Sequence, residues 1–485
     1  MIIYFKECFD FSDLMILLSD LALDALGSFI YKITVRLGEL SNNREPDLSL
    51  LQQTIRYVEN MLQKNVPPTL ANIVSSRLQT SIFQAVVAIF KIFQKSGFSK
   101  CQDLQHKMIV EMWLAVIHPS IIFFDFSFET FYNLGKKYCS QFCITFLDEV
   151  FAKARHICVV KLELSYLFLR EKVFNCLCEL KNLVEITFHG CNNAMVIALS
   201  EKCCRLKKLD IKTSPLISDK CVPSIIKFHC LEYLDIRDTY ISNNGVKDII
   251  KKLTQLRVFN SFLTIPHLSL LEECNPDISS LGFRLIEYGD FLPLTFKNLT
   301  SVSISFRYVY GQSFVSLKDS LVELGQKLRE LRLDNVDGTD LQFIAVNCPS
   351  LNLIGLSFQK TSSLGFPDVF SLDTYSQKYP LPVFHSIQSC EFNLKNCCLI
   401  QHILSSFVNV KKVLLHELNK PFCFLFVHIL QSMKNDCINE LFVKGNRFQL
   451  HGNKLLIYKT GGSVTIDSME KLEDLVTHVV DIKKA

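Results

Sequence analysis

The sequence has few of the features that mark membrane or secreted proteins. It contains a single Trp, and no apolar run approaches the roughly 20 residues of a membrane-spanning helix. The apolar stretch 81–93 is too short, and Gln84 and Lys91 interrupt it. Several charged residues among the first 20 argue against a signal peptide. We therefore expect no membrane segment, and a location in the cytoplasm or the nucleus.

The common signatures of catalysis and cofactor binding are also absent. There is no G-x-x-x-x-G-K-[ST], G-x-G-x-x-G, H-E-x-x-H or G-x-S-x-G motif. The cysteines do not form the tight C-x-x-C pairs of zinc sites. The sequence therefore predicts a protein that is not an enzyme and that binds no cofactor and no metal ion.

Charge and cysteine content exclude two further classes. Lys and Arg number 52 against 48 Asp and Glu, a net charge of +4 without a long basic run. Nucleic-acid binding needs a concentrated basic face, so we expect none. The 19 cysteines are an odd number and follow no signal peptide, which favours free thiols in a reducing compartment over a set of disulfides.

What the sequence does contain is a repeated L-x-x-L-x-L pattern. In each copy a period of two, typical of a strand, gives way to apolar residues three or four apart, typical of a helix. One such unit cannot bury its own apolar face, so the units must stack into a solenoid, with about eleven or twelve of them between residues 159 and 446. The abundant Phe, 39 residues, can fill Leu positions of the core. The clearest copies begin at Leu183, Leu206, Leu231 and Leu328.

These repeats resemble the cysteine-containing class of leucine-rich repeats found in F-box/LRR proteins and related ubiquitin-ligase receptors. The resemblance implies an α/β fold, a right-handed βα horseshoe. Ser218 and Ser242 stand where the period changes and are expected to cap helices. Small buried positions of the repeat are expected to hold Cys191, Cys203, Cys230 and Cys348.

The pattern divides the chain into three regions. Residues 1–150 lack the repeat and are expected to form an all-helical N-terminal region, which either caps the solenoid or docks an adaptor. Residues 151–450 form the leucine-rich-repeat solenoid, with an insertion at 360–386 where Gly and Pro break regular structure. Residues 451–485 are expected to form a C-terminal cap.

The first region also resembles the zyg-type LRR receptors of elongin–cullin ligases, which carry a helix L-x-x-x-C-x-x-x-Φ and a later Φ-P segment. Ala25 replaces the Cys of that helix, which is a departure, although Ala also fits a small slot. A cap, an elongin-type box and a diverged F-box remain alternatives; the F-box lacks its Leu-Pro start and its Trp. The candidate adaptor-docking residues are Leu21, Ala25 and Phe29 in the helix, and Val66, Pro67 and Leu70 in the later segment.

Residues between the Leu positions point away from the core onto the concave sheet face. There a basic column lies beside an acidic pair, which suits a peptide carrying both signs of charge, although a solvated sheet face also carries such charges. The candidate residues for partner binding are His189, Lys208, Asp210, Lys212, Tyr233, Asp235 and Arg237.

The resemblances imply a non-enzymatic substrate receptor of a cullin-RING ubiquitin ligase. Its partners would be a protein substrate on the concave face and, at the N-terminal region, an elongin or Skp-type adaptor with a cullin. The alternative is an LRR scaffold with no ubiquitin role. An adaptor box within the first 80 residues would separate the two.

Overall fold

The computed structural model forms two compact units, Met1–Leu206 and Lys207–Ala485, which are described in turn. The residues that the structure describes are 25–35, 48–75, 78–79, 82, 85, 110–127, 147, 149–163, 177, 179–285, 296–306, 314–334, 339–358, 381–394, 397–415, 440–443, 446–451, 454–459 and 462–466.

The N-terminal unit combines helices with three parallel strands. Residues 25–35 are helical, followed by α2 (Leu48–Asn65) and the short 3-10 helix η2 (Pro68–Leu70). The strands β1 (Phe123–Ser127), β2 (Val159–Glu163) and β3 (Glu185–His189) pair in sequence order. The helix α8 (Asn193–Lys202) follows, and the Asn192 side chain caps it by accepting the Met195 N–H.

The strand β1 corrects the expectation that residues 1–150 are all helical. It pairs in parallel with β2, so the strands of the repeat begin before residue 150. Its sequence, Ile121-x-x-Phe124-x-Phe126, is the repeat template with Ile and Phe in place of Leu, and Ile121 and Phe124 are buried. A search for Leu alone misses this copy because the position requires an apolar side chain rather than Leu itself.

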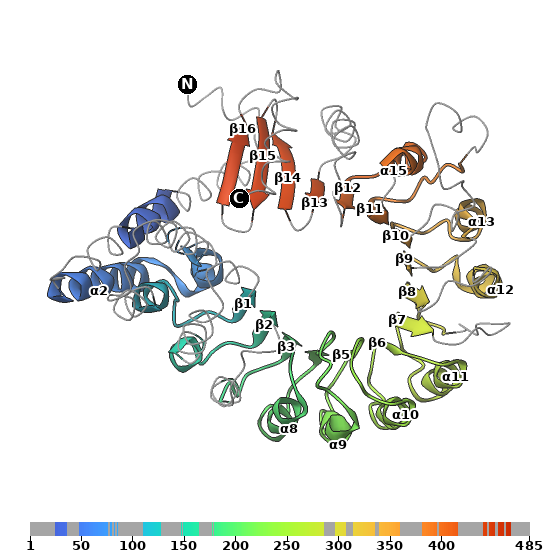
Figure 1. Ribbon diagram of the computed structural model, residues 1–485, viewed down its shortest axis with the longest axis horizontal. Helices are drawn as coiled ribbons and strands as arrows, with labels where there is room; N and C mark the ends of the chain where they lie inside the picture. The colour runs from blue at the N-terminus through green and yellow to red at the C-terminus, as the bar shows by residue number, and fades with distance from the viewer. Residues whose placement is uncertain are drawn as a thin grey trace, which may run out of the picture. The chain divides into compact units, whose positions relative to one another are not determined.

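The C-terminal unit is the regular part of the solenoid. Figure 1 shows its helices on the outer side of a row of strands. Each strand from β4 to β13 pairs in parallel with the next one along the chain. The strands are β4 (Lys208–Asp210), β5 (Tyr233–Asp235), β6 (Val258–Phe262), β7 (Ser280–Leu285), β8 (Ser301–Phe306), β9 (Glu330–Asp334), β10 (Leu353–Phe358), β11 (Ser389–Leu394), β12 (Lys412–Leu415) and β13 (Glu440–Val443).

Short helices connect these strands on the outer side. Ser242 caps one of them, α10 (Asn243–Lys252), by accepting the Gly245 N–H, as expected. Ser218 makes no such side-chain hydrogen bond and instead forms an isolated β-bridge with Tyr240 of the next repeat, which corrects its assignment as a side-chain cap. The helices are η3 (Asp219–Cys221), α9 (Val222–Ile225), α10 (Asn243–Lys252), α11 (Ile265–Cys274), α12 (Val315–Leu324), α13 (Leu341–Asn347) and α15 (Cys397–Ser405).

The last strands of this unit change direction. After β13, the strands β14 (Asn446–His451), β15 (Lys454–Lys459) and β16 (Gly462–Ile466) pair antiparallel. The strands β15 and β16 lie in the first part of the predicted C-terminal cap, residues 451–485, whereas β14 begins before it, and residues 467–485 lie outside the described residues. Most of the predicted insertion 360–386, its residues 360–380, also lies outside them.

The core follows the repeat, with Leu, Ile and Phe at its apolar positions. All but one of the largest fully buried side chains are Phe, as the Phe content predicts. Cys191, Cys203 and Cys348 are buried as expected. Cys230 is exposed, which corrects its assignment to a core slot; the residue three positions before the first Leu of that repeat is Phe228, and it is buried there instead.

Within the described residues, no helix combines the length and apolar character that crossing a lipid bilayer requires. The sequence led to the same expectation.

Candidate functional site

A tandem motif builds the polar centre of the C-terminal unit. Leu209-Asp-Ile-Lys212 ends β4, and Leu234-Asp-Ile-Arg237 ends β5 one repeat later. The Leu and Ile side chains are buried in the core, so the alternation of the strand directs the Asp, and the Lys or Arg that follows, to the opposite face. Each Asp carboxylate accepts the backbone N–H two residues further on, which shapes the turn that leaves the strand.

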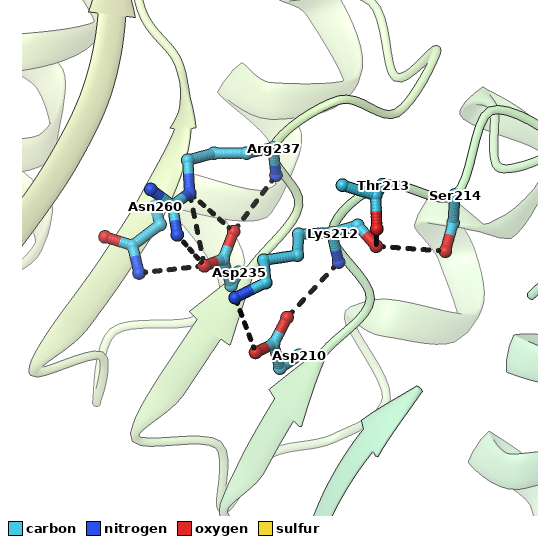
Figure 2. A network of polar contacts seen from close by, with 7 residues as sticks. All are labelled: Asp210, Lys212, Thr213, Ser214, Asp235, Arg237 and Asn260. Atoms are coloured by element: carbon cyan, nitrogen blue, oxygen red, sulfur yellow. Dashed lines mark hydrogen bonds and ion pairs between the residues drawn. The ribbon is translucent and has the colours of Figure 1, made fainter. Parts of the chain in front are cut away.

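The second copy is a tightly packed ionic cluster, which Figure 2 shows together with the first. Asp235 is 0% exposed. Its carboxylate accepts three hydrogen bonds from the side chain of Arg237, including one of 2.6 Å from the terminal nitrogen, and another of 3.2 Å from the Asn260 amide on β6. The fork of the guanidinium matches the two carboxylate oxygens, which makes this a strong charge-assisted pair.

The first copy is looser. Asp210 is also buried, but Lys212 Nζ lies 3.8 Å from its carboxylate. A Lys ammonium has no planar fork and binds as a point charge. The side chains of Lys212 and Arg237 are each 35% exposed, so the cations reach solvent while their aspartates do not.

Left-handed backbone follows both copies of the motif. Thr213 and Asp238, each one residue after the cation, have φ of 53° and 55°. Such values are uncommon outside Gly and disfavoured for a β-branched residue such as Thr. Thr213 donates its hydroxyl proton to the Lys212 carbonyl, and Ser214 donates to the same oxygen, so local hydrogen bonds hold this turn.

Tyr233 lies at the start of β5 beside this cluster. The Lys208 ammonium lies 4.9 Å from the centre of its ring, within range of a cation–π interaction. Burial raises the pKa of the Tyr233 phenol, and the negative charges of Asp210 and Asp235 raise it further. Tyr233 is therefore a neutral hydrogen-bonding group over the physiological pH range.

The structure thus brings six of the seven predicted partner-binding residues together on β4, β5 and the turns after them. The seventh, His189, is half-buried at the end of β3 in the N-terminal unit. The acidic pair does not offer its charge to a partner, because both carboxylates are buried and engaged with their own motif. The surface available for contact is cationic and aromatic.

Sequence reasoning missed the continuation of this face onto β6 and β7. Arg284 lies 5.3 Å from the centre of the Phe262 ring, and its terminal nitrogen is 3.2 Å from Asp238. Phe262 and Arg284 occupy the position that Lys212 and Arg237 hold in their own repeats, six residues after the first apolar position. Counting from that position would have found both residues, since the strand half of each repeat is intact.

A second ionic cluster lies on the same face at β8 to β11. Arg332 on β9 contacts Glu330 at 3.0 Å and Glu391 on β11 at 3.0 Å. The strand between them, β10, carries Gly355 in register with Arg332 and Glu391. A Cβ atom at Gly355 would lie 2.7 Å from Arg332 Cγ, so only Gly lets the arginine cross β10.

The buried thiols of the repeat are poor nucleophiles. Burial raises the pKa of Cys203 and of Cys221 to about 11, and that of Cys348 to about 12. A thiol with such a pKa stays protonated at neutral pH, whereas thiolate is the reactive form. In the part of the chain that the structure describes, no group of His, Cys, Asp and Glu is arranged to hold a metal ion.

The architecture of stacked strand-and-helix units is that of a leucine-rich-repeat solenoid. No protein-family model and no curated protein matches the chain. Among the solved structures that resemble it is an internalin from Listeria monocytogenes. It has 16% identity, a TM-score of 0.26, and coverage of 56% of this chain and 69% of that chain. An LRR protein from Leptospira interrogans has 12% identity, a TM-score of 0.29, and coverage of 61% and 80%. The Rad7–Elc1 complex of yeast has 13% identity, a TM-score of 0.30, and coverage of 68% and 96%. These similarities are too low to assign a function.

Proposed function

We propose that this protein is a substrate-recognition subunit of a cullin-RING ubiquitin ligase, acting in the cytoplasm or the nucleus. In this proposal the chain performs no chemistry itself. The sheet face of the C-terminal unit binds a protein substrate, and the N-terminal unit binds an elongin or Skp-type adaptor and a cullin. Part of the proposal rests on the resemblance of the repeats to those of ligase receptors, which is an argument by analogy.

The observation that carries the proposal is a set of exposed apolar side chains in the N-terminal unit. On the helix 25–35, Ala25 and Phe29 are both exposed and lie one turn apart, while Ile30 is fully buried. The helix therefore has a packed face and a separate apolar face directed to solvent. Leu21, the first residue of the predicted docking helix, lies outside the described residues.

The second predicted docking segment also lies in an exposed apolar area. Pro67 and Leu70 are exposed, and Val66 is half-buried. The side chain of Asn72 accepts the backbone N–H groups of Ile122 and Phe123, at 2.9 and 3.2 Å, which ties this segment to the start of β1. These hydrogen bonds bring two segments with exposed apolar side chains next to one another, and exposed apolar patches are typical of a protein interface. We call the exposed residues Leu70, Ile73, Ile122 and Phe123 the apolar patch.

On the sheet face, the support comes from preorganisation. The Asp235 carboxylate, which also accepts a hydrogen bond from Asn260, holds the Arg237 guanidinium in place before any partner arrives, and this lowers the entropy lost on binding. Tyr233 and Arg237 are residue types enriched among the energetic anchors of interfaces. The cationic and aromatic surface favours a substrate segment with acidic and apolar residues.

The experiment is an affinity capture with the full-length chain, blotted for elongin C, a Skp-type adaptor and cullins. The variants are Phe29→Asp and Ile73→Asp, with Tyr57→Asp as the matched control, since Tyr57 is exposed on α2 in the same unit. Elongin C captured by the wild type and by the control, but not by Phe29→Asp, would support the proposal. Capture of a Skp-type adaptor would indicate a diverged F-box, and the absence of every adaptor would leave the LRR scaffold.

A further inference from the structure

One edge of the C-terminal unit carries a depression that neither the repeat pattern nor the proposed function uses. It has a volume of about 500 Å³ and lies where β8, β9 and β10 begin. This volume falls in the range of small-molecule sites. The lining side chains come from equivalent positions of three successive repeats: Lys297, Asn298 and Thr300, then Gln326, Lys327 and Arg329, then Ser350 and Asn352.

The lining contains three cations and no carboxylate. Lys297, Lys327 and Arg329 are all exposed, and no described residue forms an ion pair with any of them. The amide of Asn298, a neutral residue of the lining, donates to Asp277 at 2.9 Å. Like charges gathered without a counter-charge destabilise one another, so the arrangement favours an anion that neutralises them.

The same edge looks different four repeats earlier, at β4 to β6. There Lys207 is 2.9 Å from Glu232, the equivalent residue of the next repeat, and Arg257 takes that position one repeat further on. In the depression, the Arg329 N–H donates to the Thr300 carbonyl and the Arg329 carbonyl accepts the Asn352 N–H, and both neighbours are neutral. At this position of the repeat, a glutamate thus stands between the cations of β4 and β6, whereas Arg329 at β9 has only neutral neighbours at β8 and β10.

The chemistry of the lining is that of a phosphate site. Arg binds phosphate oxygens through two parallel hydrogen bonds, and Lys adds compact charges. Ser350 and Asn352 add neutral donors beside them, while the Thr300 hydroxyl donates to the Ser279 carbonyl and leaves its oxygen as an acceptor. Because the lining residues stand on three neighbouring strands about 4.8 Å apart, they span more than one phosphate group.

We infer that this edge binds a small soluble ligand carrying two or more adjacent phosphates. Lys297, Lys327 and Arg329 supply the charge, and the neutral side chains orient the ligand. This inference does not depend on the ubiquitin-ligase proposal, and a separate experiment tests it.

The test is a calorimetric titration of the full-length chain with inorganic tripolyphosphate at low ionic strength. The site variant replaces all three cations: Lys297→Gln, Lys327→Gln and Arg329→Gln. The control variant, Lys251→Gln, Lys252→Gln and Arg257→Gln, makes the same change in net charge on exposed residues elsewhere in the unit. We expect saturable 1:1 binding by the wild type and the control, weakened about tenfold or more in the site variant.

Three results would overturn the inference: no saturable binding by the wild type, an equal loss in both triple variants, or orthophosphate binding as tightly as tripolyphosphate. The second result would mean a diffuse effect of net charge, and the third a site for a single phosphate. Urea unfolding of both variants guards against a folding defect. Should the site variant unfold, Arg329→Lys alone keeps the charge, removes the fork, and is expected to weaken tripolyphosphate binding measurably.

Discussion

The two ionic clusters on the sheet face of the C-terminal unit use the same chemistry in different surroundings. At β5, Arg237 pairs with the carboxylate of Asp235, which is 0% exposed. At β9 Arg332 pairs with Glu330 and Glu391, whose side chains are 41% and 24% exposed. A buried ion left alone is far more costly than an exposed one, so similar contacts have unequal consequences when they are broken. The first cluster fixes the structure of its turn, and the second mainly shapes a surface.

The largest expected effect comes from removing the two arginines separately. Arg237→Leu leaves the buried Asp235 carboxylate without its cation and should lower the free energy of unfolding by about 3 kcal/mol. Arg332→Leu is the matched control and should cost about 1 kcal/mol or less, because water reaches its glutamates. Urea titration of both full-length variants measures this difference. Equal losses would show that burial does not separate the clusters.

The glycines beside the clusters should show the same order with smaller effects. A Cβ atom at Gly282 would collide with the Asn260 amide that binds Asp235, whereas one at Gly355 would meet the more exposed Arg332. Gly282→Ala should therefore cost about 2 kcal/mol and Gly355→Ala about 1 kcal/mol, by overpacking. Thermal and urea unfolding give both values. A larger loss at Gly355 would reverse the ranking.

The clusters should also differ in alkaline solution, because only the first contains a tyrosine. The raised pKa of Tyr233 means that the folded chain keeps a proton which the unfolded chain releases above about pH 10. This contribution is fully present below that pH and is lost as the pH rises, by about 1.4 kcal/mol per pH unit. Tyr233→Phe should therefore lose less stability than the wild type between about pH 9 and pH 11.

Urea titrations at those two pH values check this prediction. Arg332→Leu serves as the control, since it should keep the pH dependence of the wild type. The same slope in Tyr233→Phe and the wild type would contradict the assignment of this term to Tyr233.

The smallest expected effect is the response of the second cluster to salt. A double-mutant cycle on Arg332 and Glu391 should give a coupling of about 0.5 kcal/mol that disappears at about 1 M NaCl. The coupling of Arg237 and Asp235 should persist at that ionic strength, because buried pairs are screened much less. A salt-resistant coupling in the second cluster would remove the distinction between them.

Much of this fold follows directly from the spacing of apolar residues. The strand halves of the repeats, including those at Leu183, Leu206, Leu231 and Leu328, coincide with strands of the structure, and the core accepts any apolar residue of suitable volume. The same tolerance explains two failures. In β1, Ile121 and Phe124 take the place of Leu. Phe228, and not the expected Cys230, fills the buried position three residues before the first Leu of its repeat.

The site was less accessible to prediction because its properties depend on neighbouring repeats. The alternation of β5 places Asp235 on the solvent side of the sheet, yet Arg237 and Asn260 cover it completely. No local pattern states that a residue 25 positions away will bury a carboxylate. The role of Gly355 is equally hidden, because it depends on the length of a side chain in the repeat before it.

The contact that passes over Gly355 also bears on how this solenoid unfolds. In a repeat protein each unit normally interacts only with its two neighbours, so stability is a chain of nearest-neighbour terms. The Arg332–Glu391 pair joins the repeat of β9 to the repeat of β11, which are not nearest neighbours because β10 lies between them. Detaching β10 therefore disrupts a term that belongs to β9 and β11 as well, and this segment gains cooperativity from an interaction in which β10 has no side chain.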